Sequence, residues 1–250
     1  MFNPQRSTLS LTIRSAPVTY FNVAVVTVML IVTLVTGGFT GQNLFNLGAL
    51  FTPSVVNDGE WWRMFTVMYL HGSFMHYFFN TMFGLVIISA SLERIIGPLK
   101  FAVVYFISGI GASAITVGAE LLSGDPRLGV GASGAIYGVL GAYLLLTYKN
   151  PEWFNPQEAQ SIRGLILINV IFTFLVPNIS ITAHLGGLGA GVLLTLLIAP
   201  KPHNRGAGKG FQNPFVDEYD PFDPKQFKRL EEIEIVEDED DEDDPWGRYS

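Results

Sequence analysis

The sequence predicts an all-α membrane protein in which six transmembrane helices form one bundle. Two observations carry this prediction. Of the 250 residues, 49% are hydrophobic and only 15% are charged, a balance typical of membrane proteins. The apolar residues also gather in six stretches that reach or approach about 20 residues, the length that a helix needs to cross the hydrocarbon core of a bilayer.

Breaks in the apolar pattern set the bounds of the six predicted spans. Gly37 and Gly38 end the first span, Pro177 ends a short fifth span, and Pro200 ends the sixth, because glycine and proline disfavour helix continuation. The segment 39–63 is mixed in character and rich in aromatic residues, so we expect an interfacial loop on the outer side. The predicted spans are 18–35, 65–92, 99–122, 133–148, 164–176 and 181–199.

Lysine and arginine in the connecting segments predict the orientation. If the N-terminus is cytoplasmic, nine basic residues of these segments lie inside and two lie outside, as the positive-inside rule requires. Six spans then return the C-terminus to the cytoplasm, and spans two, four and six begin near the outer face. The inside residues are Arg6, Arg14, Arg94, Lys100, Lys149, Arg163, Lys201, Arg205 and Lys209, and the outside residues are Arg63 and Arg127.

Charge divides the chain into a membrane part and a tail. Residues 1–209 carry a net charge of +4, whereas the remainder carries −11 and includes the acidic run 231–244. Like charges at this density repel one another and cannot form a core. We therefore expect a cytoplasmic N-terminal segment at 1–17, a membrane domain at 18–200 and a disordered acidic cytoplasmic tail at 201–250. The tail is either a solvated segment without function or a binding segment for a basic partner, and no nucleic-acid partner is expected.

Two polar residues within the apolar stretches are candidates for catalysis. Ser133 lies in Gly131-Ala132-Ser133-Gly134 at the start of span four, and His184 lies in Ala183-His184-Leu185-Gly186-Gly187 in span six. Lipid offers no water to such side chains, so polar residues at these positions are often functional. Glycines on both spans predict a close contact, which a Ser–His hydrogen bond of about 2.6 to 3.2 Å needs. The alternative is that both residues serve only helix packing.

A third polar group lies at the start of span two. His76 and Asn80 are four residues apart and therefore share one face of a helix, so their donors could stabilise one negative charge as an oxyanion hole does. A metal site is the rival interpretation, since His71, His76 and His184 are available ligands. No carboxylate lies in the outer half of these spans, and the spacing from His71 to His76 divides them between two faces. We therefore expect no metal.

Together these motifs resemble the rhomboid family of intramembrane serine proteases. The resemblance covers residues 18–200 and rests on the order of the motifs along the chain. It implies a six-transmembrane-helix rhomboid bundle that uses no cofactor. The matching motifs are Glu60-Trp61-Trp62-Arg63, the His-x4-His-x3-Asn run from His71 to Asn80, Glu93 with Gly97, Gly131-Ala132-Ser133-Gly134, and Ala183-His184-Leu185-Gly186-Gly187.

The resemblance also implies a role for each site residue. Ser133 is the nucleophile and His184 is its general base, in a dyad without an acidic third member. The oxyanion hole consists of His76, Asn80 and the backbone N–H of Ser133. The implied supporting residues are Tyr137, which stacks on His184, together with His71, Arg63 and Gly131.

The function implied by the resemblance is cleavage of transmembrane segments in single-span membrane proteins, near the outer face of the lipid bilayer. The expected location is the inner membrane of a bacterium, with both termini in the cytoplasm. Two alternatives stay open from the residues alone. One is a non-enzymatic protein of the same fold that binds transmembrane helices, and the other is a small transporter or channel lined by the polar residues.

Overall fold

The computed structural model describes residues 15–177 and 179–198. The predicted N-terminal segment, apart from its last three residues, and the predicted tail at 201–250 lie outside the described residues. The helices in chain order are α2 (Pro17–Thr36), α3 (Gly41–Asn46), α4 (Thr52–Asn57), α5 (Arg63–Thr66), the 3-10 helix η1 (Val67–Tyr69), α6 (Phe74–Phe78), the π-helix η2 (Phe79–Ser89), α7 (Ala90–Ile96), α8 (Pro98–Ser123), α9 (Ser133–Lys149), the 3-10 helix η3 (Pro151–Trp153), α10 (Pro156–Leu175) and α11 (Ile181–Ile198).

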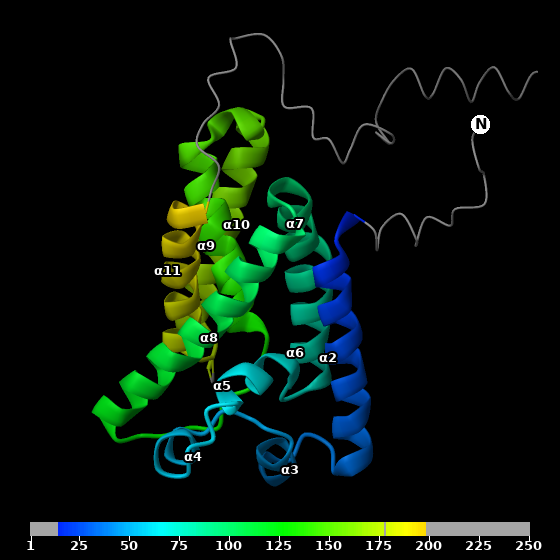
Figure 1. The fold of residues 1–250 in the computed structure, drawn as a ribbon, viewed down its shortest axis with the longest axis vertical. Coiled ribbons are helices and arrows are strands. Elements are labelled where there is room, and N and C mark those ends of the chain that lie inside the picture. The colour runs from blue at the N-terminus through cyan, green and yellow to red at the C-terminus, as the bar shows by residue number, and fades with distance from the viewer. Residues whose placement is uncertain (1–14, 178, 199–250) are drawn as a thin grey trace, which may run out of the picture. The chain divides into compact units, whose positions relative to one another are not determined.

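The predicted all-α membrane fold is confirmed. In the described part of the chain, β pairing is limited to one isolated bridge between Leu50 and Gly129. The helix α9 has 17 residues, at the lower end of the usual range for a span, and it packs against α8, α10 and α11 (Figure 1). A sixth crossing at α9 stays a prediction. The stretches long and apolar enough to cross a bilayer are Pro17–Thr36, Phe74–Ile96, Pro98–Ser123, Pro156–Leu175 and Ile181–Ile198.

Two predicted spans have different bounds in the structure. The sequence predicts that span two begins at residue 65, but the segment after it forms η1 and a turn, and the spanning stretch begins at Phe74. The prediction of a short fifth span is wrong, because α10 runs for 20 residues. Its start is fixed by a capping box, in which the side chains of Asn155 and Glu158 each accept the other residue's backbone N–H.

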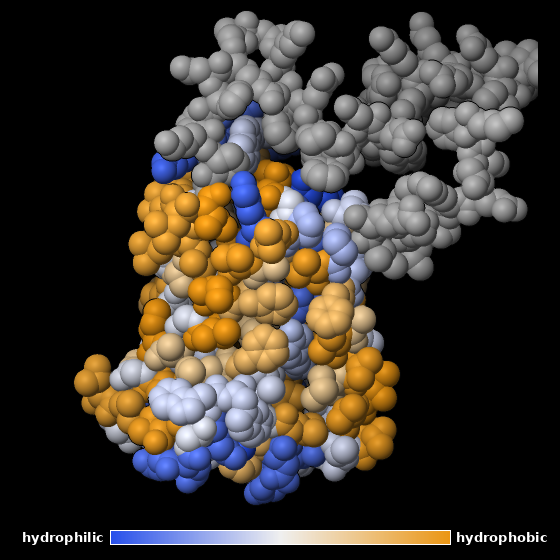
Figure 2. Space-filling view, viewed as in Figure 1, coloured by the Kyte–Doolittle hydropathy of each residue, from blue (hydrophilic) through white to orange (hydrophobic). Residues whose placement is uncertain are grey.

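Apolar side chains cover the outside of the helix bundle. Figure 2 shows hydrophobic residues over most of the visible face between the two ends, and hydrophilic residues at the end that carries α3 and α4. Side chains on the outward faces of the spans are highly exposed, for example Val35 at 81% and Leu197 at 82%. Soluble monomers rarely expose apolar patches of this extent. Contact with lipid accounts for this surface, and the chain is an integral membrane protein.

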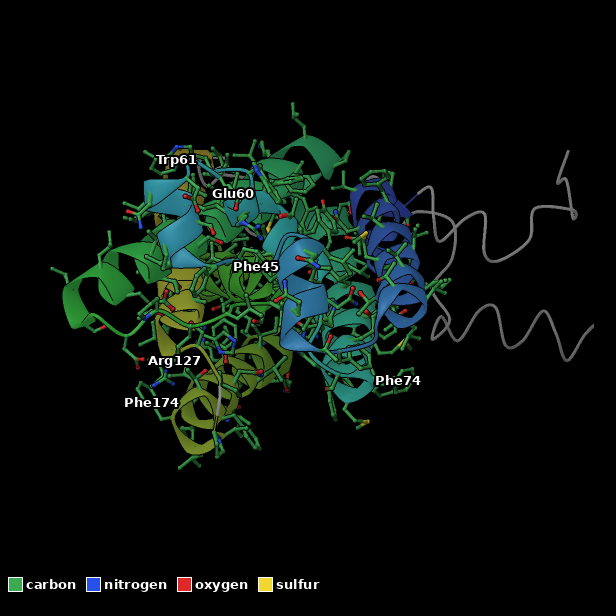
Figure 3. The ribbon with its side chains drawn as sticks, turned by 90° about the horizontal axis from the view of Figure 1, so that it is seen from below. Phe45, Glu60, Trp61, Phe74, Arg127 and Phe174 are labelled. Carbon is green, nitrogen blue, oxygen red and sulfur yellow. The ribbon has the colours of Figure 1, made fainter. Side chains whose placement is uncertain are left out.

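Arg63 holds the loop between α2 and α6 against the helices. Its buried guanidinium donates to the backbone carbonyls of Phe45 and Ala49 at 2.7 and 2.9 Å and pairs with Glu60 at 2.5 Å. It also lies over the ring of Phe45, 4.2 Å from the centroid. Figure 3 views this end of the molecule and shows Phe45, Glu60 and Trp61 on the loop. A buried charge with all these partners suits the structural role expected for Arg63.

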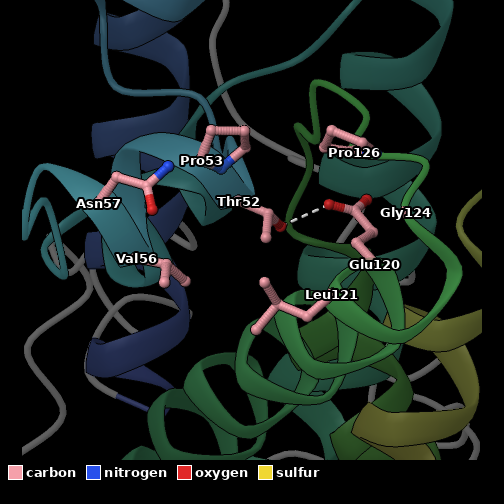
Figure 4. A pocket seen from close by; sticks show the side chains of 8 residues that line it. All are labelled: Thr52, Pro53, Val56, Asn57, Glu120, Leu121, Gly124 and Pro126. Atoms are coloured by element: carbon pink, nitrogen blue, oxygen red, sulfur yellow. Dashed lines mark hydrogen bonds between the residues drawn. The ribbon is translucent and has the colours of Figure 1, made fainter.

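A second contact joins this loop to the end of α8. Thr52, the first residue of α4, donates to the carboxylate of Glu120 at 2.5 Å, beside a shallow pocket of about 160 Å³ (Figure 4). The pocket includes none of the predicted site residues, so it belongs to the attachment of the loop. Its lining consists of Thr52, Pro53, Val56, Asn57, Glu120, Leu121, Gly124 and Pro126.

At the opposite end of the bundle, a buried carboxylate caps the N-terminus of α2. Glu93 is 1% exposed, and its two oxygens accept the backbone N–H groups of Val18 and Thr19 at 2.9 and 2.7 Å. The first N–H groups of a helix have no partner within the helix and carry a partial positive charge. Glu93 satisfies two of them and ties α2 to α7.

The helices α9 and α11 are in direct backbone contact. Gly187 and Gly191 of α11 lie against the carbonyl groups of Gly134 and Gly138 of α9, so closely that a Cβ on either α11 glycine would overlap a carbonyl oxygen. Apolar burial gives little drive for association between helices in lipid, and small residues compensate by allowing close packing. The predicted contact between spans four and six is confirmed.

Replacing Gly191 with alanine should destabilise the bundle, because the new Cβ would overlap the carbonyl of Gly138. We expect a loss of about 1 to 3 kcal/mol in the free energy of unfolding, the usual cost of overpacking, seen as a lower thermal midpoint in detergent. Gly189→Ala is the matched control, since a Cβ there would meet no atom within 4 Å. Equal midpoints for the two variants would show that the contact is not tight.

Candidate active site

Ser133 is the first residue of α9. The chain reaches it through Gly131, whose φ of 129° is a conformation that other residues rarely adopt. The N–H of Gly131 donates to the carbonyl of Val67 at 3.0 Å. This bond holds the turn against η1 and leaves Ser133 partly exposed.

The glycine contact places His184 beside the start of α9. His184 lies in the first turn of α11, and a Cβ on Gly134 would lie 3.6 Å from the carbonyl oxygen of Ala183. The backbone next to Ser133 therefore lies close to the backbone next to His184. Among the hydrogen bonds of the described residues, none joins the two side chains. The fold brings the two candidates to one place without a direct bond between them.

Two neighbours hold the imidazole ring of His184. Tyr137, one helical turn after Ser133, stacks on the ring with centroids 4.0 Å apart and planes 20° apart. On its edge, Nδ1 lies 2.9 Å from Oγ1 of Thr173 in α10. All three of these side chains are buried. The ring is thus fixed on one face and at one nitrogen, and Nε2 has no hydrogen bond within residues 15–177 and 179–198.

Sequence reasoning missed Thr173. A threonine within an apolar helix usually donates to the carbonyl four residues earlier, and Thr173 does so with Asn169 at 3.0 Å. Its contact with His184 depends on how α10 docks, which no local pattern encodes. The spacing of Asn169 and Thr173, two polar residues one turn apart in an apolar run, is the one signal that could have drawn attention to it.

The ring of His76 borders the same small space as Ser133. A Cβ on Gly131 would lie 2.8 Å from Nε2 of His76 and 3.6 Å from Oγ of Ser133. The other ring nitrogen, Nδ1, accepts the backbone N–H of Gly72 at 3.4 Å. A neutral histidine that accepts at Nδ1 carries its proton on Nε2. The nitrogen nearest to Gly131 is therefore a donor.

Asn80 lies one turn beyond His76, at the start of η2. Its side chain is 8% exposed, and Nδ2 donates to the backbone carbonyl of His76 at 2.9 Å. An amide nitrogen carries two hydrogens, so one donor is left for a ligand. The π-helical stretch begins directly before Asn80, and widened turns of this kind are frequent at functional sites.

His71 lies next to the site but is buried within the protein. Its ring stands edge-on to that of His76 at a centroid distance of 5.1 Å and also contacts Tyr77. Burial, together with the neighbouring His76, lowers the pKa of His71 to about 3, so the ring stays neutral at ordinary pH. In the described ranges, no group of three histidine, aspartate or glutamate side chains could hold a metal ion. These contacts suit a supporting role for His71.

Comparisons with known proteins match this architecture. A family model of the rhomboid domain matches residues 58–201. The putative rhomboid protease YdcA of Bacillus subtilis is 37% identical over 161 residues, which cover 64% of this chain and 75% of YdcA. The rhomboid protease GluP of the same organism is 35% identical over 174 residues, which cover 69% of this chain and 33% of GluP.

One relative is named as inactive. The inactive RHOMBOID-like protein 8 of Arabidopsis thaliana is 33% identical over 173 residues, which cover 67% of this chain and 47% of that protein. The matched domain covers more than half of the chain, and the two Bacillus relatives carry the name of proteases. The expected assignment to the rhomboid-type serine proteases is confirmed, and the chain belongs to the rhomboid family.

Proposed function

We propose that this protein is an intramembrane serine endopeptidase in which Ser133 is the nucleophile and His184 is its general base. The observation that carries the proposal is the backbone contact of α9 with α11, which joins the start of one helix to the first turn of the other. Tyr137 and Thr173 hold the ring of His184 by one face and by Nδ1. Its second nitrogen is then available to take a proton from a nucleophile.

The proposed reaction is acyl transfer through the Ser133 hydroxyl. Oγ attacks the scissile carbonyl carbon while Nε2 of His184 takes the hydroxyl proton, and the imidazolium then gives that proton to the leaving amine. Breakage of the C–N bond leaves an acyl-enzyme. A water molecule, deprotonated by His184, hydrolyses the ester and frees the serine. Catalytic hydrogen bonds often shorten only when substrate binds, which suits a dyad that has no Ser–His bond at rest.

Three donors are proposed to stabilise the negative charge that develops on the substrate's carbonyl oxygen. They are the backbone N–H of Ser133, Nε2–H of His76 and the free amide hydrogen of Asn80. The N-terminus of α9 adds a favourable partial positive charge. This assignment of donors is supported by the position of His76, whose ring borders the same space beside Gly131 as the Ser133 hydroxyl. Donors that are already in place where the negative charge develops stabilise it most strongly.

The proposed substrates are transmembrane segments of single-span proteins, cut near the outer face. The carbonyls of a helical segment are already hydrogen-bonded, so such a substrate must unwind before attack.

Entry of the substrate from the side of the bundle is favoured at α10, because its buried residues are limited to Ala159, Ile166 and Thr173. The distribution of basic residues favours an outer position for the site and cytoplasmic termini. We further propose that the membrane domain spans residues 18–200 and lies in a bacterial inner membrane. For the acidic tail, both alternatives stay open: a solvated segment without function, or a binding segment for a basic partner.

Ser133→Ala and His184→Ala should each abolish cleavage of a transmembrane reporter, with a loss of at least about 10³-fold in turnover. The assay is proteolysis of the reporter in liposomes, with the cut mapped by mass spectrometry. Unchanged thermal midpoints would show that both variants fold. Ser91→Ala is the control, because the hydroxyl of Ser91 donates to the carbonyl of Ile87, one turn earlier in the same spanning stretch, and we expect normal cleavage.

Turnover like that of the wild type in either variant would remove the dyad from the mechanism. A wild-type protein that neither cuts reporters nor reacts with a fluorophosphonate would favour the alternative of a non-enzymatic helix-binding protein. The cut site carries a further test, since a cleavage mapped to the inner half of the reporter would contradict the proposed depth.

Gly131→Ala should lower turnover by roughly 10²-fold, the usual effect of displacing one oxyanion-hole donor. The added Cβ would approach the ring of His76 to 2.8 Å at a backbone φ that disfavours side chains. Gly129→Ala is the matched control, because its Cβ would meet Leu50 at an ordinary 3.4 Å. Similar turnover in Gly131→Ala and Gly129→Ala would argue against an oxyanion hole beside Gly131.

A further inference from the structure

Thr173 links His184 to α10 through a set of short contacts. Its Oγ1 lies 2.9 Å from Nδ1 of His184, 2.6 Å from the hydroxyl oxygen of Tyr137 and 3.0 Å from the carbonyl oxygen of Asn169. The Tyr137 hydroxyl also donates to the Asn169 carbonyl at 2.6 Å. Thr173 is 2% exposed, so bulk water does not compete for these positions. The three oxygens and the ring nitrogen must share whatever protons they carry among themselves.

The number of hydroxyl protons available determines whether Thr173 or Nδ1 of His184 is the donor in their hydrogen bond. The three oxygens make three mutual contacts of 2.6, 2.6 and 3.0 Å, and the two hydroxyls supply two protons for them. If Thr173 gave its proton to Nδ1, one proton would remain for all three contacts, and two pairs of close oxygens would repel each other. If Nδ1 carries the proton and donates to Thr173, both hydroxyl protons stay among the oxygens.

We infer that Thr173 is a positioning residue that accepts the hydrogen bond of Nδ1–H and so selects the tautomer of His184 whose free lone pair is on Nε2. The inference rests on the proposed function, in which Nε2 of His184 is the general base. In a serine protease triad, a carboxylate accepts this bond and fixes both the tautomer and the orientation of the ring. Thr173 supplies the same acceptor as a neutral side chain.

A neutral acceptor suits the surroundings of this site. An ionised carboxylate inside the bundle would lose its hydration, at a cost that an isolated partner rarely offsets. A threonine hydroxyl whose proton stays among oxygens of Tyr137 and Asn169 is already satisfied and presents only lone pairs to the ring. The dyad thereby gains an oriented base without a second buried charge.

The position of Thr173 on α10 has a mechanical consequence. Ser133 and Tyr137 belong to α9 and His184 belongs to α11, so the ring is aligned only while all three helices are docked together. Displacement of α10 would withdraw the acceptor from Nδ1 and leave the choice of tautomer free. Alignment of the base is therefore coupled to the helix that has few buried residues.

The test compares Thr173→Val, which keeps the shape of the side chain without its hydroxyl, with Thr173→Ser, which keeps the hydroxyl. The full chain in liposomes cleaves a fluorogenic transmembrane substrate, and a fluorophosphonate reports the reactivity of Ser133 without substrate entry. We expect Thr173→Val to lower kcat and the labelling rate by about 10- to 100-fold, with KM unchanged within about twofold. Thr173→Ser should retain kcat within about threefold of the wild type.

Thr33→Val is the matched control, because Thr33 is an equally buried threonine on α2 whose hydroxyl donates to the carbonyl of Met29. We expect it to cleave like the wild type. If Thr173→Val fails to fold, Thr173→Ala takes its place under the same expectations. Three results would overturn this inference but leave the proposed function intact. They are a kcat of Thr173→Val equal to that of the wild type, a loss of kcat in Thr173→Ser as large as in Thr173→Val, and an effect of Thr173→Val confined to KM. A wild type that neither cleaves nor labels would overturn the proposed function, and this inference with it.

Discussion

The backbone contact between α9 and α11 is the constraint on which the rest of this structure depends. Glycines on α11 let carbonyl groups of α9 approach to van der Waals distance with no side chain between the helices. Glycine within a helix costs about 0.8 to 1 kcal/mol relative to alanine, and the close packing that it allows offsets this cost in lipid. Because Ser133 and His184 flank this contact on the two helices, their proximity follows from the packing of the backbones.

Buried polar groups of the bundle lie where the protein offers them hydrogen-bond partners. The buried charges Arg63 and Glu93 lie near opposite ends, where unpaired backbone groups of loops and helix starts are available as partners. At His184 the partners are the neutral side chains of Tyr137 and Thr173. A neutral network can be buried at modest cost if every donor finds an acceptor. The imidazole of His184 is thus held by uncharged groups.

Hydropathy was sufficient to predict most bounds of the apolar stretches, whereas the sixth crossing, at α9, stays a prediction. It placed the ends of α2, α8, α9 and α11 within one or two residues, because glycine, proline and charge interrupt the apolar runs there. Hydropathy placed the start of span two too early, because the apolar residues before α6 belong to short helices of the interfacial loop. It also failed at the start of α10, where the capping box had the clearer signal. Amphipathic and interfacial segments share their composition with spans, so composition alone cannot separate them.

Some features of the candidate site could likewise be predicted from the sequence, and others could not. Ser133 and His184 could be singled out as candidates because polar groups in apolar segments are costly, and their neighbouring glycines predicted the contact between α9 and α11. The spacing of His76 and Asn80 suggested paired donors, and the family resemblance supplied the role of Tyr137. These roles stay predictions, although the stacking of Tyr137 on His184 is present in the structure. Thr173 could not be predicted, since its contact with Nδ1 arises from the docking of a third helix. Local spacing does not encode such a contact.

The measurement that tests the central claim most directly is the rate at which a fluorophosphonate labels Ser133 when the contact between α9 and α11 is altered. Gly187→Ala would place a Cβ against the carbonyl of Gly134, next to Ser133, whereas the same substitution at Gly189 meets open space. At a temperature where both variants are folded, we expect Gly187→Ala to lose labelling by at least about tenfold and Gly189→Ala to label like the wild type. Equal labelling in the two variants would contradict the claim that glycine packing assembles the dyad.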